Sequence, residues 1–130
     1  NVLSELARPV PEQRVVAFVR GLDKALLSVI TIEELRFGIA RLSRGRKKDH
    51  LTAAIDELIA GYNDAVLPVG TREAERSAAM RATQEALGRR IHLADALIAA
   101  TAMEHELTLA TRNTKDFMSL GLEVVDPWNR

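Results

Sequence analysis

Three acidic side chains stand near the predicted ends of strands or at the predicted start of a helix. Glu34 follows a strand predicted over residues 25–30, and Asp116 follows another over residues 107–110. Asp95 lies in the first turn of a predicted helix. Because ligands of open parallel sheets bind beyond the carboxyl ends of the strands, we expect these carboxylates to converge there. Converging carboxylates repel one another, and a divalent cation with a preference for oxygen ligands, Mg²⁺ or Mn²⁺, would remove that repulsion.

Each of these acids also has a structural interpretation. Thr31 and Glu34 have the spacing of a helix capping box, Asp95 suits the positive end of a helix dipole, and Asp116 could cap a short turn. On spacing alone the structural interpretations are favoured. Asp95, however, stands in the segment 93–100, which is apolar on almost every side. A buried carboxylate there is costly unless it is paired, hydrogen-bonded or bound to a metal, which favours a chemical role.

The elements that must position these acids alternate along the chain. Short apolar segments predict buried strands, and longer segments with apolar residues at helical spacing predict helices. This alternation is typical of an α/β domain with a central, mostly parallel sheet and helices on both of its faces. The predicted strands cover residues 25–30, 65–69, 107–110 and 122–125, and the principal helices cover residues 11–21, 31–42, 51–62, 71–87 and 93–105.

The composition bounds the class of protein. The 130 residues predict one domain, long enough to bury a core without disulfide bonds. The absence of cysteine excludes zinc–thiolate sites and suits a reducing cytoplasm. Equal numbers of basic and acidic residues, 18 of each, argue against a general polyanion-binding protein but not against local basic patches. No apolar run has the roughly 18 residues of a membrane span.

One local basic patch stands out. The run from Arg41 to Lys48 has five cations in eight residues, so its side chains Arg44, Arg46, Lys47 and Lys48 are candidates for contacts with an RNA backbone. The alternative is a solvated carboxyl end of a helix, where cations are favourable. Aromatic residues are few, which favours recognition of RNA by shape and phosphates over base stacking. Gly38 weakens a predicted helix, and we expect a close packing contact there.

Four segments together resemble the motifs of PIN-domain ribonucleases, and in particular the FitB-like branch of the VapC toxins of bacterial toxin–antitoxin pairs. They occur in the order of the family and span the chain. Glu34, Asp95 and Asp116 fall at the positions of acids in the second, third and fourth motifs. The segments are Asn1-Val2-Leu3-Ser4-Glu5-Leu6, Thr31-Ile32-Glu33-Glu34-Leu35-Arg36-Phe37-Gly38, His92-Leu93-Ala94-Asp95-Ala96-Leu97-Ile98-Ala99-Ala100-Thr101-Ala102 and Thr111-Arg112-Asn113-Thr114-Lys115-Asp116-Phe117.

The resemblance implies a three-layer α/β/α PIN-like domain over residues 1–130 that hydrolyses RNA phosphodiester bonds with Mg²⁺ or Mn²⁺. It implies that Asp95, Glu34 and Asp116 form the catalytic, metal-binding acid cluster. Asn1, Thr111 and Asn113 are expected to hydrogen-bond the carboxylates or the substrate phosphate. The partners that it implies are a small antitoxin protein and a second copy of the chain in a homodimer.

Two departures from the family pattern matter. The first acid of the family precedes the position of Asn1 by two residues, and most of the first strand precedes it too, so we expect that the natural start is missing. Family members place the acid of the fourth motif at the position of Asn113 or of Asp116, and we favour Asp116 because Asn113 carries no charge. The alternative functions are a metal-dependent phosphohydrolase or DNA nuclease on the same scaffold, and a catalytically inactive PIN fold that binds RNA or a protein.

Overall fold

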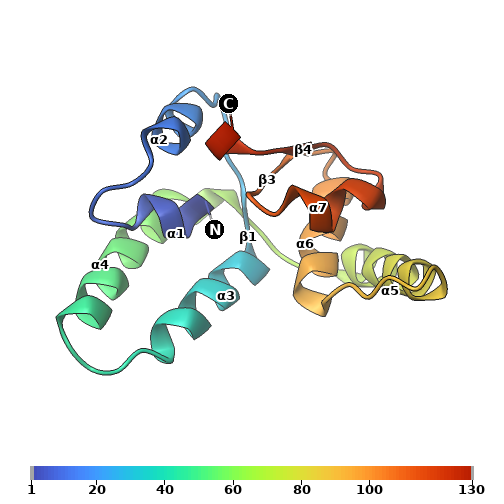
Figure 1. Cartoon of the computed structure of the whole chain (residues 1–130), viewed down its shortest axis with the longest axis horizontal. Coiled ribbons are helices and arrows are strands. Elements are labelled where there is room, and N and C mark those ends of the chain that lie inside the picture. The colour runs from blue at the N-terminus through green and yellow to red at the C-terminus, as the bar shows by residue number, and fades with distance from the viewer. Residues whose placement is uncertain (1, 130) are drawn as a thin grey trace.

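The computed structural model describes residues 2–129 of the chain, which fold into helices around two pairs of parallel strands (Figure 1). Each of these strands is only two residues long. The first residues of paired strands lie opposite each other in both pairs. The pairs are β1 (Leu27–Ser28) with β2 (Val66–Leu67), and β3 (Leu109–Ala110) with β4 (Val124–Val125).

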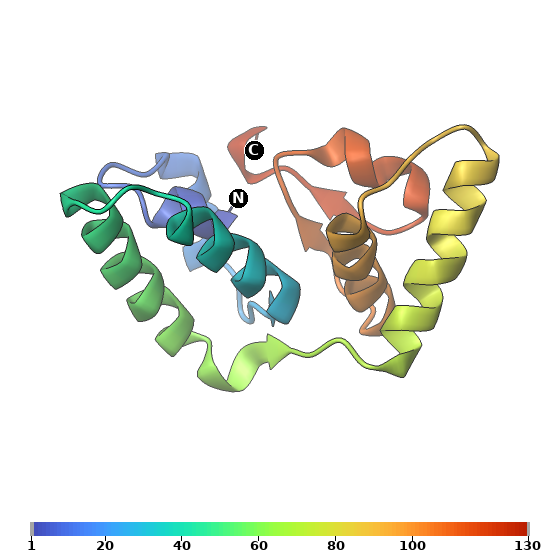
Figure 2. The ribbon, with the colours of Figure 1, turned by 90° about the horizontal axis from the view of Figure 1, so that it is seen from below.

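The helices divide between the two strand pairs. The first four, with β1, lie on one side of the molecule, and the others lie with β3 and β4 on the opposite side (Figures 1 and 2). Figure 2 shows the chain crossing between the two sides through β2 and the segment that follows it. The α-helices are α1 (Val2–Leu6), α2 (Gln13–Arg20), α3 (Val29–Ala40), α4 (Arg46–Gly61), α5 (Thr71–Ala86), α6 (Leu93–Glu104) and α7 (Thr114–Phe117). Single 3₁₀ turns occupy Asn63–Ala65 (η1), Met118–Leu120 (η2) and Pro127–Asn129 (η3).

Helix α3 begins two residues earlier than its sequence predicts. The Ser28 hydroxyl accepts a hydrogen bond from the Ile30 N–H at 3.1 Å, so Ser28 is the amino-terminal cap. This cap draws two β-branched residues into the helix that the sequence assigns to the preceding strand. The predicted capping box of Thr31 and Glu34 is therefore wrong. Glu34 lies one turn inside the helix, and the hydrogen bond of the cap does not use its carboxylate.

Helix α4 also begins early, at Arg46 rather than at residue 51. The basic residues that end the cationic run therefore form the first turn of α4, and the prediction that they finish the preceding helix is wrong. Lys48 has a structural role there, because its Nζ donates to the carbonyl oxygens of Ala40 and Leu42, each at 3.3 Å. The first carbonyl ends α3 and the second lies two residues beyond it, where a positive charge is favourable.

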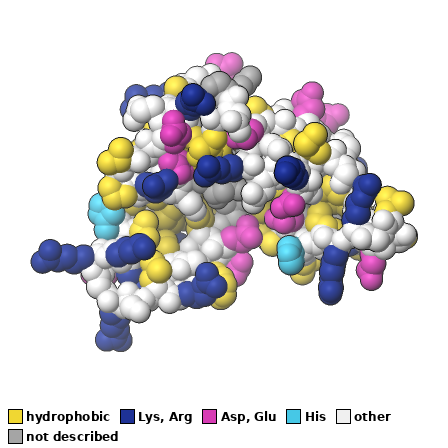
Figure 3. Space-filling view, viewed as in Figure 1, with side chains coloured by type: hydrophobic (Ala, Val, Ile, Leu, Met, Phe, Trp, Pro, Cys, Tyr) yellow, Lys and Arg dark blue, Asp and Glu magenta, His cyan; other side chains and the backbone are white. Residues whose placement is uncertain are grey.

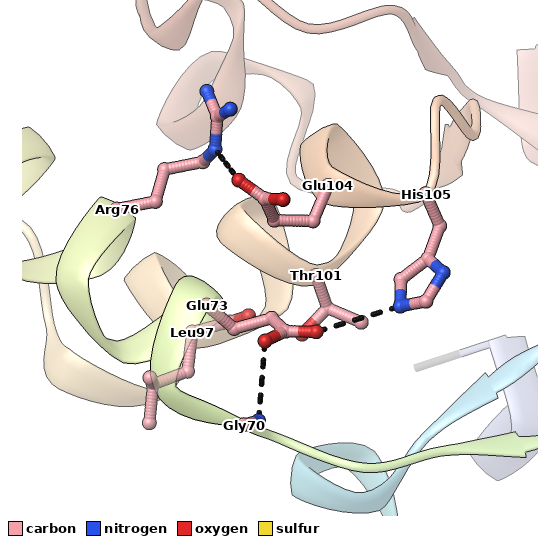
Figure 4. A network of polar contacts seen from close by, with 7 residues as sticks. All are labelled: Gly70, Glu73, Arg76, Leu97, Thr101, Glu104 and His105. Atoms are coloured by element: carbon pink, nitrogen blue, oxygen red, sulfur yellow. Dashed lines mark hydrogen bonds and ion pairs between the residues drawn. The ribbon is translucent and has the colours of Figure 1, made fainter.

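Helix α6, which carries Asp95, packs chiefly against α5. Its buried face consists of small residues, because Ala96, Ala99 and Ala100 are each 0% exposed. A polar network joins the two helices at the opposite end of α6 from Asp95 (Figure 4). The Glu73 carboxylate accepts the Gly70 N–H at 3.2 Å and lies 3.5 Å from Nε2 of His105. In the same network Arg76 pairs with Glu104 at 2.7 Å.

A groove of about 620 Å³ lies between the two pairs of strands and leads to the predicted site. Its apolar walls include Leu27 and Leu67 from one pair and Leu109 and Val125 from the other. The observed strands thus confirm the predicted α/β class with parallel pairing. They form two separate pairs on either side of this groove rather than one continuous central sheet. Among residues 2–129 no helix combines the length and the apolar character that crossing a membrane requires.

Candidate functional site

Three different elements carry the three predicted acids. Glu34 lies on α3, which follows β1 directly, Asp95 lies in the first turn of α6, and Asp116 lies in the short helix α7 that follows β3. Glu34 and Asp95 both line the groove between the strand pairs, although they are 61 residues apart in the chain. Two of the three acids that were expected to converge thus line the same groove. Asp116 is exposed and lies outside the groove lining.

The electrostatics connect all three acids. Burial raises the pKa of Asp95 above its ordinary value, the negative charge of Asp116 raises it further, and His92 opposes these effects. Burial also raises the pKa of Glu34, and the charge of Asp95 raises it further. Asp95 therefore experiences repulsion from Asp116 and exerts it on Glu34. Such mutual repulsion in a partly buried site is typical of functional carboxylates and would be relieved by a bound cation.

The donors have the chemistry that a divalent cation needs, but they are not gathered into one coordinating set. Carboxylate oxygens are the ligands that Mg²⁺ and Mn²⁺ prefer. Within residues 2–129, however, no three His, Asp or Glu side chains stand close enough to hold one ion together. Glu34 and Asp95 are the pair best placed to hold an ion, because both face the same groove and couple electrostatically.

Thr111 and Asn113 lie at the end of β3, where they were expected to support the acids. Thr111 is 2% exposed, and its hydroxyl accepts the Asn113 N–H at 3.1 Å. This bond turns the chain from β3 into α7, and Asn113 occupies the amino-terminal cap position of that helix without a capping hydrogen bond from its side chain. Both residues line the groove with Glu34 and Asp95. Asn1, the remaining predicted supporting residue, lies outside the described residues.

The predicted backbone-binding cations lie away from the acid cluster. Arg44 is in the α3–α4 connection, and Arg46, Lys47 and Lys48 are in the first turn of α4. In Figure 3 Lys and Arg side chains project at the lower left, where Figure 1 places the α3–α4 connection. The length of α3 between Glu34 and the α3–α4 connection corresponds to a rise of roughly 10–15 Å. A substrate would have to extend along α3 to contact both.

Sequence reasoning assigned no role to Glu5, a carboxylate that is 6% exposed. It accepts the Glu12 N–H at 2.7 Å and pairs with Arg8 at 3.2 Å, and so fastens α1 to the start of α2. The hydrogen bond from Glu12 is the main reason that the pKa of Glu5 is lowered. A signal was present, because Glu5 falls in the first of the four motif segments. Glu5 is therefore a structural carboxylate.

The PIN domain model matches residues 1–120 of the chain. Toxin FitB of Neisseria gonorrhoeae is 39% identical over 132 residues, covering 99% of this chain and 95% of that protein. VapC ribonuclease Y4jK of Sinorhizobium fredii is 34% identical over 131 residues, covering 98% of this chain and 94% of that protein. Both relatives are matched over nearly their whole length.

Two solved structures show the same fold. FitAcB from Neisseria gonorrhoeae superposes with a TM-score of 0.88 at 39% identity, covering 100% of this chain and 96% of that chain. A toxin–antitoxin complex from Klebsiella pneumoniae superposes with a TM-score of 0.68 at 29% identity, covering 89% and 85%. These matches confirm the predicted PIN-like architecture. The chain belongs to the PIN-domain family, together with the FitB and VapC toxins.

Proposed function

We propose that this protein is a metal-dependent endoribonuclease that acts as the toxin of a toxin–antitoxin pair. The observation that carries the proposal is that Glu34 and Asp95, from distant parts of the sequence, line one groove, where the charge of Asp95 raises the pKa of Glu34 and the charge of Asp116 raises that of Asp95. The relative named as a VapC ribonuclease supports RNA as the substrate. The relative named as a toxin supports the biological role.

In this proposal Glu34 and Asp95 hold Mg²⁺ or Mn²⁺, and the negative charge of Asp116 strengthens the attraction of the site for the ion. The bound ion would lower the pKa of water and neutralise charge on the phosphate oxygens. Glu34, which faces the same groove, would accept the proton of the attacking water. Asn113 donates a side-chain hydrogen bond to the phosphate, and Thr111 holds the turn that presents it.

The partners follow from the same proposal. A small antitoxin encoded beside the toxin would cover the site, as the toxin–antitoxin complex from Klebsiella pneumoniae suggests by its likeness. Large apolar side chains remain available for a partner or a second copy, because Val10 is 81% exposed and Met118 is 69% exposed. We propose that the protein acts in the cytoplasm as a homodimer and that the antitoxin must be removed before activity is measured.

The test is cleavage of total RNA by the protein freed of antitoxin, with Mg²⁺ and with EDTA. Discrete fragments that disappear in EDTA and in the Asp95→Asn variant are expected. Asp23→Asn is the matched control, because Asp23 is an exposed acid in the α2–β1 loop and should leave the fragments unchanged. Cleavage that persists in Asp95→Asn would exclude the proposed site, and cleavage that persists in EDTA would exclude the metal.

A second candidate is a PIN fold that binds RNA or a protein without cleaving it. It is favoured by the absence of a three-carboxylate set among residues 2–129. Binding of labelled RNA by a folded protein that leaves the RNA intact at saturating Mg²⁺ and Mn²⁺ would support it. A parallel incubation with duplex DNA tests the related alternative of a DNA nuclease or phosphohydrolase, since cleavage of DNA with intact RNA would reassign the substrate.

A further inference from the structure

Gly38, in the interior of α3, has no packing reason to be glycine. A methyl group built at its Cα would meet nothing within 4 Å, so the close contact expected from the sequence is absent among the described residues. Its backbone is ordinary helix and does not require the left-handed conformation. Glycine nevertheless weakens a helix interior relative to alanine. No atom in the described part of the chain fills the space beside the Gly38 Cα, and we refer to this open space as the hollow.

The hollow lies in a row of residues that begins at the acid site. Glu34, Gly38 and Arg41 follow one another at steps of four and three residues, which places them on one face of the helix. Phe37 flanks this row and is 57% exposed, although it is a large apolar side chain. The Arg41 guanidinium lies 5.0 Å from the centroid of the Phe37 ring. We call these four residues the α3 strip.

The α3 strip leads from negative to positive charge. It starts at Glu34, which lines the groove, and ends beside the α3–α4 connection with its exposed cations Arg44, Arg46 and Lys47. Figure 3 shows Lys and Arg side chains projecting over that connection. Clustered exposed cations favour a polyanion, and an exposed ring beside a guanidinium is a stacking surface for a nucleic-acid base. This charge pattern favours RNA over an apolar segment of a protein as the occupant.

We propose that the α3 strip binds the RNA strand on one side of the cleaved phosphate. A base stacks on Phe37, the backbone passes over the hollow at Gly38, and the following phosphates lie against Arg41 and the cations of the connection. The proposal rests on the proposed nuclease site, because it takes Glu34 as the place of cleavage. One turn of α3 separates Glu34 from Phe37, a rise of about 5 Å, so the stacked base belongs to a nucleotide close to the cleavage point.

Gly38→Ala separates stability from binding. Alanine favours the helix, so the variant should melt a few degrees higher than the unaltered chain. Its methyl group occupies the hollow, so the affinity for RNA should fall about tenfold, the scale of one lost favourable contact. Gly61→Ala is the matched control. Gly61 is the last residue of α4, away from the α3 strip, and a methyl group there would also meet no described atom within 4 Å. It should leave the affinity for RNA unchanged.

Two further variants test the individual contacts. Phe37→Ala should weaken binding roughly 5- to 150-fold, the range for loss of one stacked base. Arg41→Gln should weaken binding to all RNA sequences alike and reduce the slope of log affinity against log salt by about one. The probe is a fluorescein-labelled, mixed-sequence single-stranded RNA of 12 nucleotides, measured by anisotropy in EDTA so that no cleavage occurs. Circular dichroism verifies that each variant is folded.

Unchanged RNA affinity in both Gly38→Ala and Phe37→Ala would overturn the proposal. If the same variants instead disrupt self-association in sedimentation velocity, or association with the cognate antitoxin, a protein covers the strip and the proposal is equally wrong. Failure of the nuclease site is distinguishable, because it appears as cleavage that persists in Asp95→Asn, whatever the binding result. Weakened binding in both strip variants, with normal binding in Gly61→Ala, is the result that we expect.

Discussion

Asp95→Asn should have opposite effects on the stability of the protein without and with metal. Burial raises the pKa of Asp95 above its ordinary value of 3.8, and repulsion from Asp116 raises it further. Because the folded pKa is the higher one, ionisation of Asp95 destabilises the fold at neutral pH. Without metal, the neutral Asn variant should therefore melt at the same temperature as the unaltered protein or at a higher one.

The pH dependence has a definite sign. The destabilisation by Asp95 is fully present above its folded pKa and disappears as the pH falls through that pKa towards 3.8. The advantage of Asp95→Asn should therefore shrink on acidification. Comparing the two proteins at each pH removes the contributions of all other groups, among them Glu73, whose lowered pKa is due mainly to a backbone hydrogen bond and changes stability in the opposite direction.

Metal should reverse the order of the two melting temperatures. An ion at about 100 times its Kd stabilises the state that binds it by about 2.7 kcal/mol. For a domain of this size each kcal/mol corresponds to roughly 3–5 °C, so saturating Mg²⁺ should raise the Tm by about 10 °C. Asp95→Asn should gain little, because it lacks one of the two best-placed carboxylates, whereas the Asp23→Asn control should gain as much as the unaltered protein.

Differential scanning calorimetry with Mg²⁺, Mn²⁺ and EDTA gives all of these values. A rise in Tm of equal size in Asp95→Asn and in the unaltered protein would refute the assignment of Asp95 as a ligand. No rise in either protein at millimolar Mn²⁺ would refute the metal site itself.

Three further changes have definite expectations. Ser28→Ala removes the cap that bonds the Ile30 N–H, so it should destabilise the protein by about 1 kcal/mol in urea unfolding and slow RNA cleavage by loosening the helix of the proposed base; equal stability would contradict the cap. Glu5→Gln should destabilise the protein at pH 7, because the hydrogen bond from the Glu12 N–H lowers the pKa of Glu5 and so favours its charged form in the fold. This loss of stability should vanish as the pH falls from 4.5 through the folded pKa, and a loss that does not depend on pH would argue against a charge effect. Ile55→Ala should cost about 2–5 kcal/mol in the same urea experiment because Ile55 is only 2% exposed, and a much smaller cost would mean that the surrounding core collapses around the change.

From α2 onward the order and type of the principal elements were predictable because they depend on local patterns, whereas helix α1 was not predicted. The predicted bounds of α5 and α6 lie within one residue of those observed, because α5 is rich in alanine and ends before Gly88 and α6 is apolar along most of its length. The starts of α3 and α4 were missed for different reasons. A serine hydroxyl sets the first, and the second is a turn of Arg and Lys residues that has no apolar periodicity. Strand lengths were overestimated because pairing depends on distant partners that no local pattern specifies.

The site was predictable in its members and only partly in its arrangement. The approach of Glu34 and Asp95 followed from the strand-end rule, and the position of Asp95 from an apolar helix in which a carboxylate is costly. Whether three carboxylates form one coordinating set depends on side-chain distances, which spacing does not specify. The open surface at Gly38 was also invisible in the sequence, because a tightly packed glycine and an exposed one have the same letter.

The central claim is that water, activated at the Glu34–Asp95 site, hydrolyses RNA. The most direct test is to cleave RNA in water enriched in ¹⁸O, with Mg²⁺, and to analyse the fragment ends by mass spectrometry. Attack by water breaks one P–O bond and leaves one ¹⁸O atom in a terminal phosphate of the product, which is the predicted result. Fragments that end in 2′,3′-cyclic phosphates without ¹⁸O would show that the ribose hydroxyl attacks instead, and would contradict the account.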